Sequence, residues 1–371
     1  MKLKIAVLGV KGIPHTGGIE IIMEEICTRL VQRGHKVDIF VRSNYMKGKT
    51  LHNYKGIGLP FSGGIHSKNL DAISHSITAL MKILITGYDI VYFNSVGLSV
   101  LSWIPRLFGM NTVVHTHGLD WKREKWSKVA RILLRFSAYT AVKCPNLTIS
   151  CLGDKRFLEA TYGKQCTYIP NGAPQMVFRQ PELIKKYGLN GKDYILFMSR
   201  LVPEKGCHFL IKAWESLSDA GKKGMKLVIA GDTNFKDTYY YNLIEYKKLK
   251  DVIFTGFVSG KLKNELHSNA YCFVQPSTIE GLPISILEAL SYGLFVIASD
   301  ITGNKDTLKD CGVTFQNKNI DDLRLKIEEA INMSPGLLKA ESIKAKEIVQ
   351  NEYNWEHVVD KIEMELIGLL R

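Results

Sequence analysis

The sequence predicts an α/β protein with two doubly wound domains, each a parallel sheet with helices on both faces. Three observations predict this fold class. The 371-residue chain is longer than one hydrophobic core supports, since single cores stop growing at roughly 250 to 300 residues. Its 46% apolar and 23% charged content is that of a folded globular protein. Short apolar runs bounded by glycine alternate with helical patterns, and this alternation occurs twice.

The first half of the chain supplies the first domain, which we place at residues 1–172. Its candidate strands are short apolar runs. They cover residues 4–8, 36–41, 90–93, 112–115 and 147–150. Apolar residues at helical spacing predict helices between these strands, notably at residues 18–33 and 125–143.

The second half repeats the pattern and predicts a second domain at residues 173–352. Its candidate strands cover residues 194–199, 227–230, 252–254, 272–274, 295–298 and 313–315. Helices are expected at residues 207–218 and 284–292. Three prolines and one glycine in residues 169–181 mark the join between the domains. The last segment, residues 353–371, contains an amphipathic helix at 355–370 that we expect to pack back on the first domain.

The excess positive charge lies in the first half. The net charge is +13, and residues 1–180 hold 24 Lys and Arg against 10 Asp and Glu, whereas residues 181–371 hold 25 against 26. A one-sided basic surface suits nucleic acid, a phosphate-bearing lipid or an acidic bilayer. No zinc-finger or RNA-recognition string is present, so nucleic acid is not the expected partner. No apolar run approaches the roughly 20 residues of a spanning helix, so we expect peripheral membrane contact.

Other absences narrow the function further. Seven scattered cysteines without a C-x-x-C pair fit a reducing cytoplasm. There is no D-x-D, and the His and Cys residues lack metal-ligand spacing, so no metal cofactor is expected. There is no G-x-S-x-G, the usual signal of a serine hydrolase.

Two segments could bind phosphate. Gly17 and Gly18 lie in the segment GVKGIPHTGGIE at residues 9–20, where the backbone can approach a ligand and the following helix offers free N–H groups. The spacing does not match G-x-G-x-x-G, so a nicotinamide dinucleotide is not predicted. Arg200 and Lys205 lie in SRLVPEKG after a strand of the second domain and could together bind a diphosphate. The alternatives are a structural turn and a solvated basic loop.

Two further segments could bind a sugar. Glu280 and Glu288 lie two helical turns apart, and vicinal hydroxyls favour such acceptors. Between them, backbone N–H groups at the helix start can bind a sugar or phosphate; the residues there are Gly281, Leu282 and Pro283. His117 follows a strand of the first domain and could donate to a sugar hydroxyl. The alternatives are a solvated helix face for the glutamates and local hydrogen bonds for the histidine.

A basic stretch near residues 122–143 interleaves cations with apolar side chains. The cations are Lys122, Arg123, Lys125, Lys128, Arg131 and Arg135, and the apolar residues are Trp121, Trp126, Leu133, Leu134 and Phe136. Such a helix can lie on an anionic bilayer. The alternative is a surface helix with its apolar stripe in the core.

Taken in order, these segments resemble the retaining glycosyltransferases of family 4, which have the GT-B fold of two Rossmann-like domains facing a cleft. The resemblance covers nearly the whole chain. It implies that Glu280 contacts the transferred sugar and Glu288 the ribose of a nucleotide-sugar donor. It also implies that Arg200 and Lys205 bind the donor diphosphate.

For the first domain, the resemblance implies that the Gly17–Gly18 loop approaches that diphosphate, that His117 holds the donor sugar and that the acceptor binds there. The strings GIPHTGGIE and GLDWKREKW also resemble a bacterial subgroup known as rhamnosyltransferases. Many members of that subgroup have Asp at the position of His117, so the donor sugar is left open.

The expected reaction is sugar transfer with retention of configuration to a lipid-linked saccharide at the cytoplasmic face of the membrane. The products would be capsule, O-antigen or exopolysaccharide. The alternatives are a nucleotide-sugar epimerase or phosphorylase of the same architecture, and a non-enzymatic basic module that binds nucleic acid or membrane.

Overall fold

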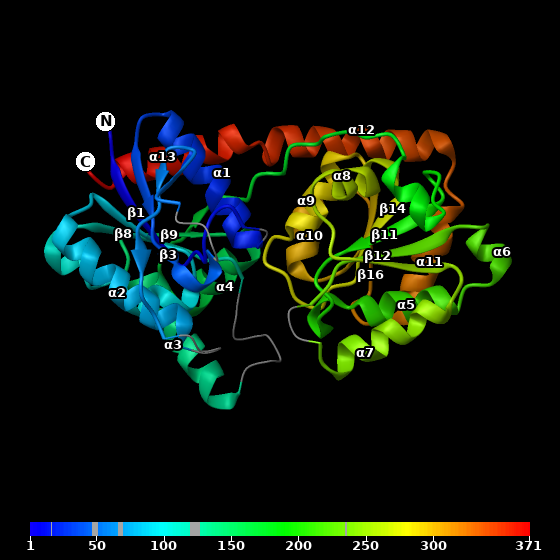
Figure 1. The fold of residues 1–371 in the computed structure, drawn as a ribbon, viewed down its shortest axis with the longest axis horizontal. Helices are drawn as coiled ribbons and strands as arrows, with labels where there is room; N and C mark the ends of the chain where they lie inside the picture. The colour runs from blue at the N-terminus through cyan, green and yellow to red at the C-terminus, as the bar shows by residue number, and fades with distance from the viewer. Residues whose placement is uncertain (16, 47–50, 66–69, 119–126, 234–235) are drawn as a thin grey trace. The chain divides into compact units, whose positions relative to one another are not determined.

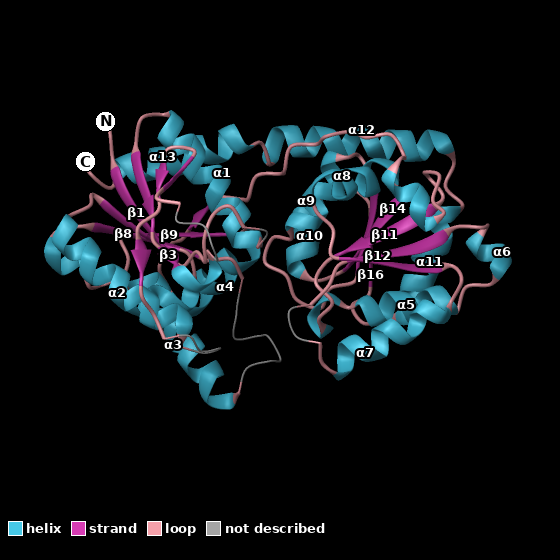
Figure 2. Ribbon diagram, viewed as in Figure 1, coloured by secondary structure: helices cyan, strands magenta, loops and turns pink. Residues whose placement is uncertain are grey.

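The computed structural model describes residues 1–15, 17–46, 51–65, 70–118, 127–233 and 236–371 (Figures 1 and 2). The chain divides into two compact units. Unit 1 is Met1–Gly172 with Asn354–Arg371, and unit 2 is Ala173–Tyr353.

Unit 1 is built on a sheet whose described strands run in the order β10-β9-β8-β7-β1-β2-β5-β4. Every neighbouring pair is parallel except β4 with β5. The strands are β1 (Lys4–Leu8), β2 (Lys36–Ile39), β4 (Asn53–Tyr54), β5 (Ile57–Gly58), β7 (Ile90–Phe93), β8 (Asn111–His115), β9 (Leu147–Ser150) and β10 (Thr167–Tyr168). Strands β7 and β9 are buried throughout, as parallel strands covered on both faces must be.

Helices cover this sheet (Figure 2). They are α1 (Gly18–Gln32), α2 (Asp71–Thr86), α3 (Lys128–Lys143), α4 (Leu152–Tyr162) and α13 (Trp355–Gly368). Short 3-10 turns η1 (Ser43–Tyr45), η2 (Val96–Leu101) and η3 (Pro105–Phe108) connect them. In α1 the buried apolar residues recur at helical spacing; they are Ile22, Met23, Ile26, Cys27 and Leu30.

Unit 2 has a fully parallel sheet in the order β13-β12-β11-β14-β15-β16. Its strands are β11 (Tyr194–Met198), β12 (Lys226–Ala230), β13 (Val252–Gly256), β14 (Cys272–Gln275), β15 (Phe295–Ser299) and β16 (Val313–Phe315). The helices and turns are η5 (Leu183–Tyr187), η6 (Pro203–Lys205), α5 (Cys207–Glu215), α6 (Asp219–Lys222), α7 (Thr238–Ile244), η7 (Glu245–Lys248), α8 (Gly260–Asn269), α9 (Ile284–Ser291), α10 (Thr302–Leu308), α11 (Ile320–Ile331) and α12 (Pro335–Glu352).

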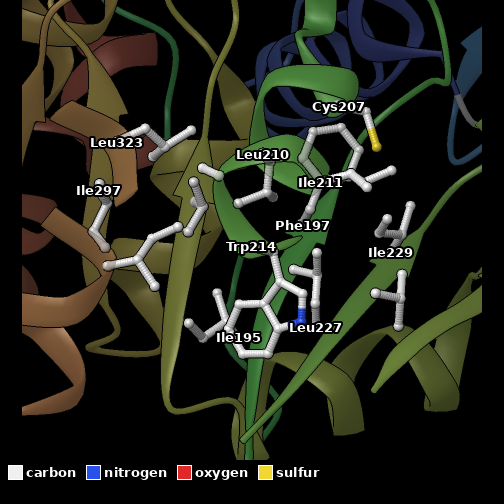
Figure 3. Close-up of a cluster of buried hydrophobic side chains, with 14 of the residues drawn as sticks. Ile195, Phe197, Cys207, Leu210, Ile211, Trp214, Leu227, Ile229, Ile297 and Leu323 are labelled. Atoms are coloured by element: carbon white, nitrogen blue, oxygen red, sulfur yellow. The ribbon is translucent and has the colours of Figure 1, made fainter. Parts of the chain in front are cut away.

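Alternate residues of the central strand β11 enter the two cores of unit 2. Ile195 and Phe197 pack with Trp214 of α5 on one face (Figure 3). Leu196 packs with Ile286 of α9 on the other face. Because the strand is buried on both faces, its sequence is continuously apolar, which is the pattern that predicted it.

The C-terminal helix α13 returns to unit 1, as predicted. Arg33, the residue directly after α1, forms ion pairs with Glu356, Asp360 and Glu363 along one face of α13, at 2.7 to 2.9 Å. Unit 2 ends at Tyr353, one residue later than predicted. The Tyr353 hydroxyl donates to the carbonyl oxygens of Asp306 and Thr307, which also belong to unit 2.

One predicted strand extends too far: the strand expected at residues 36–41 ends at Ile39. Residues 36–41 form two elements, β2 and the short β3 (Val41–Arg42), which pairs with β6 (Phe61–Ser62) in a separate two-stranded sheet. The chain leaves the main sheet at Phe40, whose N–H donates to the Val7 carbonyl at 3.0 Å, while the next N–H donates to Pro60. The apolar pattern of residues 36–41 does not show that the chain changes its hydrogen-bond partner at Phe40.

Two predicted helix bounds also need correction. The helix predicted at 207–218 ends at Glu215, because Ser218 instead caps α6 by accepting from the Gly221 N–H. The helix predicted at 125–143 begins at Lys128, capped by Ser127, which accepts from Ala130. Residue 125 lies outside the described residues.

Candidate functional site

The strand order of unit 2 reverses between β11 and β14. In open α/β sheets, ligands bind beyond the carboxyl ends of the strands at such a reversal. Arg200 follows β11 and Glu280 follows β14, so the structure brings both predicted residues to this place.

Lys205 reaches the same edge because the loop after β11 packs tightly on the loop after β14. Gly206 has φ +71°, and a Cβ on it would lie 1.9 Å from the Pro276 carbonyl oxygen. The Thr278 N–H donates to the Glu204 carbonyl at 2.9 Å. Glycine is therefore required at 206 both for its backbone conformation and for the close approach.

Glu280 is held by a small polar network. Its Oε1 accepts from Lys205 Nζ at 2.6 Å and from Gln275 Nε2 at 2.8 Å. Ser285 Oγ donates to Gln275 Oε1 at 2.9 Å. The Lys205 and Glu280 side chains are 16% and 10% exposed, so solvent screens this ion pair only weakly.

Sequence reasoning missed Gln275 and Ser285. The available signal was a polar residue at the carboxyl end of an otherwise apolar buried strand, since Gln275 ends the run CFVQ. Such a residue needs a partner, and the network supplies one.

Arg200 differs from Lys205 in being exposed. Within the described part of the chain, no carboxylate forms an ion pair with it. A guanidinium at this edge can form two parallel hydrogen bonds with a phosphate.

Glu288 lies on α9 and forms a short ion pair with Lys263 of α8 through Oε1. Sequence reasoning missed Lys263, because 25 residues separate the partners and each lies on a different helix. His267, one turn after Lys263, stacks on Tyr292 with ring centroids 5.2 Å apart. Glu288 therefore faces α8 and is not part of a solvated helix face.

The residues between the two glutamates form the start of α9. Gly281 and Leu282 precede Pro283, which occupies the N-cap position without a side-chain cap hydrogen bond. A Cβ on Gly303 of α10 would lie 2.4 Å from the Glu280 carbonyl oxygen, so glycine at 303 lets α10 pack closely on this backbone.

In unit 1 the strand order reverses between β1 and β7, and the glycine loop follows β1. Gly17 is the N-cap of α1 and Gly18 its first residue. Glu20, which sequence reasoning missed, folds back over this start: its Oε1 accepts from the Lys11 N–H at 3.2 Å. A Cβ on Gly17 would lie 1.9 Å from Glu20 Oε2, so glycine leaves room for the carboxylate.

His117 follows β8 at the same edge of unit 1. Its ring lies 4.2 Å from that of His115, and its Nε2 lies 3.5 Å from Asn94 Oδ1, a long hydrogen bond. Desolvation lowers the pKa of His117 to about 4. The ring is therefore neutral at pH 7 and carries one N–H donor.

Basic side chains also surround an exposed ring at this edge; we call this set the Tyr45 cluster. Lys11 Nζ and Arg42 Cζ lie over the Tyr45 ring at 5.3 and 5.9 Å, and the His15 ring lies 6.3 Å from it. Arg42 is 9% exposed and pairs with Asp71 at 2.8 Å, but its Nε is buried without a hydrogen-bond partner. Within the residues described, no carboxylate pairs with the Lys11 ammonium.

Helix α3 exposes apolar side chains at its amino-terminal half. The most exposed are Val129, Ile132, Leu133 and Phe136, at 57% to 69%. Its carboxyl-terminal half packs in the core through Ala138, Ala141 and Val142. The carboxyl-terminal half thus follows the predicted alternative of an apolar stripe in the core, whereas the amino-terminal half exposes its apolar side chains. The predicted residues Trp121, Lys122, Arg123, Lys125 and Trp126 lie outside the described residues.

Among the described residues we searched for a membrane-spanning helix and for a group of metal-binding side chains. No helix in them is both long and apolar enough to cross a membrane. They also contain no group of three or more His, Cys, Asp or Glu side chains that could hold a metal ion.

Comparisons with known proteins match both units. The family model for "Glycosyltransferase Family 4" matches residues 16–174, and the model for "Glycosyl transferases group 1" matches residues 179–359. The crystal structure of Anabaena HepE in complex with UDP and glucose matches with a TM-score of 0.80 at 20% identity, covering 99% of this chain and 100% of that chain. This chain has the GT-B fold, and each of its two halves matches a glycosyltransferase domain. The predicted fold class is thereby confirmed.

The names of curated relatives of this chain print different donors. A GDP-mannose-dependent phosphatidylinositol monomannoside mannosyltransferase of Mycobacterium tuberculosis is 26% identical over 94% of each chain. An Escherichia coli UDP-Gal:alpha-D-GlcNAc-diphosphoundecaprenol alpha-1,3-galactosyltransferase is 30% identical over 63% of this chain and 64% of that protein. The matches to the first two relatives span about half the length of those proteins, 46% and 48%.

Proposed function

We propose that this glycosyltransferase binds a nucleotide sugar on unit 2 and transfers the sugar, with retention of configuration, to a saccharide acceptor bound by unit 1. The observation that carries the proposal is the arrangement at the β11/β14 reversal. There, an exposed Arg200, which has no carboxylate partner among the described residues, lies at the same edge as the largely covered Lys205–Glu280 pair. A cation left open at a ligand-binding edge suits an anion, and a diphosphate is the anion of nucleoside diphosphate sugars.

Each predicted residue then has a task. Arg200, Lys205 and the backbone N–H groups of Gly281 and Leu282 neutralise the diphosphate without a metal ion. Pro283 has no N–H and contributes its fixed backbone at the start of the helix. Glu280 binds hydroxyls of the transferred sugar, and Glu288 binds the ribose. The Gly17–Gly18 loop approaches the diphosphate from unit 1.

During transfer, the bond between the anomeric carbon and the phosphate oxygen breaks and a bond to the acceptor oxygen forms. The acceptor's proton leaves with the nucleoside diphosphate. The leaving diphosphate gains negative charge, which Arg200 and Lys205 stabilise. A neutral His117 donates a hydrogen bond to the donor sugar and so helps to orient it.

The acceptor is proposed to be a lipid-linked saccharide. Two observations support this. The Tyr45 cluster offers the Lys11 ammonium to an anionic group such as a phosphate. The Escherichia coli relative is named for an acceptor that is a diphosphate-linked lipid saccharide.

Helix α3 would place the protein at the inner face of the cell membrane. Its exposed Ile132 and Phe136 can insert among acyl chains, while Lys128 and Arg135 on the same helix meet anionic headgroups. The work of the enzyme would then be the assembly of a bacterial surface polysaccharide such as capsule, O-antigen or exopolysaccharide. None of the seven cysteines, all of which are described, forms a disulfide, which suits a reducing compartment.

The test combines binding and turnover. Purified protein is screened against UDP-, GDP- and dTDP-linked sugars by thermal shift, since a ligand of the folded state raises the melting temperature. A nucleotide-linked rhamnose belongs in the panel because of the resemblance to rhamnosyltransferases. Productive donors are then incubated with a prenyl-diphosphate-linked N-acetylglucosamine.

A lengthened acceptor together with free nucleoside diphosphate supports transfer, and the anomeric configuration of the product decides retention. An epimerised nucleotide sugar without diphosphate release indicates an epimerase, and a requirement for inorganic phosphate indicates a phosphorylase. The absence of a thermal shift with every donor contradicts the proposal.

A further inference from the structure

The carboxylate of Glu280 is held at one of its two oxygens. Oε1 accepts from Lys205 Nζ at 2.6 Å and from Gln275 Nε2 at 2.8 Å, so each lone pair of this oxygen has a donor. Oε2 has no hydrogen-bond partner among the described residues. Oε2 is therefore the oxygen that Glu280 presents to a ligand.

The side chain of Gln275 is fixed on three sides. It is 0% exposed at the end of β14, and its Nε2 also donates to Ser277 Oγ at 2.6 Å, while its Oε1 accepts from Ser285 Oγ at 2.9 Å. An ionised carboxylate accepts hydrogen bonds and donates none, so the amide nitrogen faces Glu280 and the amide oxygen faces Ser285. Turning the amide over would place its oxygen against the carboxylate.

The two donors to Glu280 Oε1 differ in what the donor diphosphate would do to them. Lys205 carries its charge on a flexible stem and is itself proposed to bind the diphosphate, which has more negative charge than a carboxylate and competes for the ammonium. Gln275 is neutral and buried, so the diphosphate does not draw it away. The hydrogen bond from Gln275 therefore keeps Glu280 in place while Lys205 is shared with the ligand.

We propose that Gln275 and Ser285 are positioning residues that act through Glu280. Ser285 orients the Gln275 amide, Gln275 holds Oε1 of Glu280, and Oε2 is thereby aimed at the hydroxyls of the transferred sugar. The inference rests on the proposed role of Glu280 toward that sugar. Neither positioning residue is assigned a contact with the donor.

Gln275→Met is the main test, because methionine keeps an unbranched side chain of similar length and removes the amide. We expect kcat to fall by about 10- to 100-fold, the effect of a small misplacement of a group that binds the reacting sugar. Turnover is measured as nucleoside diphosphate release, with the nucleotide sugar and the prenyl-diphosphate-linked N-acetylglucosamine used above. The affinity for the nucleoside diphosphate alone, measured by titration calorimetry, should stay unchanged because it lacks the sugar.

A second measurement separates positioning from a general loss of structure. In a Glu280→Gln background, Gln275→Met should cause little further loss of turnover, because a positioning residue acts through the group that it holds. A merely structural residue would lower turnover by the same factor in both backgrounds.

Ser285 gives an independent test if Gln275→Met does not fold. Ser285→Ala should lower kcat about fivefold, the worth of one net hydrogen bond, and Ser285→Thr, which keeps the hydroxyl, should restore it. Ser291→Ala is the matched control on α9, since the Ser291 hydroxyl donates to the Leu287 carbonyl at 2.8 Å. This control should keep the kcat of the wild type.

The inference is overturned if folded Gln275→Met keeps the wild-type kcat, or if it loses nucleoside diphosphate affinity by the same factor as kcat. Equal kcat values for Ser285→Ala and Ser285→Thr would also overturn it. If Glu280→Gln itself keeps normal turnover, the role proposed for Glu280 fails and the inference falls with it. If Glu280→Gln loses turnover while Gln275→Met does not, the positioning inference alone fails.

Discussion

At the carboxyl edges of their sheets, each unit has a described cation without a carboxylate partner among the described residues, Arg200 in unit 2 and Lys11 of the Tyr45 cluster in unit 1. The two edges differ in their other charged side chains. In unit 2 each predicted carboxylate has a lysine partner: Glu280 pairs with Lys205 and Glu288 with Lys263. In unit 1 Arg42 keeps an unpartnered Nε, and the first half of the chain is the basic one, with a net charge of +14 over residues 1–180 against −1 over residues 181–371.

We infer from this difference that the carboxyl edges of the two sheets suit different ligands. A site whose polar groups are fixed by their own network before binding loses little entropy when the ligand arrives, which favours a ligand of constant shape such as a nucleotide. An edge with open cations and exposed apolar residues favours a charged, lipid-bearing partner. The predictions below test the two edges separately, from the largest expected effect to the smallest.

Glu280→Gln should have the largest effect. The amide keeps the shape of the carboxylate but cannot accept as a charged group from both Lys205 and the sugar hydroxyls. We expect turnover to fall by about 10³-fold, within the range for loss of a group that binds the reacting part of the substrate. Turnover is measured as nucleoside diphosphate release with acceptor present.

The control for Glu280 is the affinity for nucleoside diphosphate alone, which lacks the sugar and should change much less. Normal turnover in a correctly folded Glu280→Gln protein would remove this residue from the site.

Lys11→Met tests the other edge. Removing the one cation of the Tyr45 cluster that no described carboxylate neutralises should raise the KM for a diphosphate-linked acceptor about tenfold, the worth of one charge-assisted hydrogen bond. Donor affinity should be unchanged. Lys36→Met, an exposed lysine at the amino end of β2, is the matched control. Equal effects of the two variants would contradict an acceptor role for the cluster.

Ile132→Ser combined with Phe136→Ser should reduce membrane binding several-fold, because each side chain loses apolar surface that can be buried in the bilayer. Both residues are exposed, at 66% and 57%, so the free energy of unfolding should change by less than about 1 kcal/mol. Co-sedimentation with vesicles that contain anionic lipid measures the effect. Leu325→Ser on α11, at 46% exposure, should leave sedimentation unchanged.

The smallest effect concerns pH. The folded pKa of His117 is lowered to about 4, whereas an unfolded histidine titrates near 6.5. Between these values the unfolded state binds the proton and the folded state does not, so stability is present above pH 6.5 and is lost as the pH falls toward 4. His117→Gln should therefore lose less stability over this window, as measured by thermal unfolding. The same slope in both proteins would show that His117 is not desolvated.

The buried strands could be predicted from sequence because each is a continuous apolar run with helices on both faces, as in β11 and β14. The break between β2 and β3 could not be predicted, because it depends on which backbone groups lie beside Phe40. The site residues that follow strands, such as Arg200 and Glu280, could be located from the strand pattern alone.

Their partners could not be located in this way. Lys205 and Glu280 are 75 residues apart, and nothing in the sequence states that a glycine at 206 allows their loops to touch. The sequence does not distinguish Lys263 from other lysines of an amphipathic helix, because its pairing with Glu288 depends on how α8 packs against α9. The exposure of Phe136 could not be predicted either, because an amphipathic pattern does not show what covers the apolar face of a helix.

The most direct test of the central claim is hydrogen exchange on the full chain with and without saturating nucleoside diphosphate. The account predicts that the largest protection falls in unit 2, at residues 199–206 and 280–288, where the donor edge lies. Protection confined to unit 1, at the Tyr45 cluster or the glycine loop, with these two segments unchanged, would contradict it.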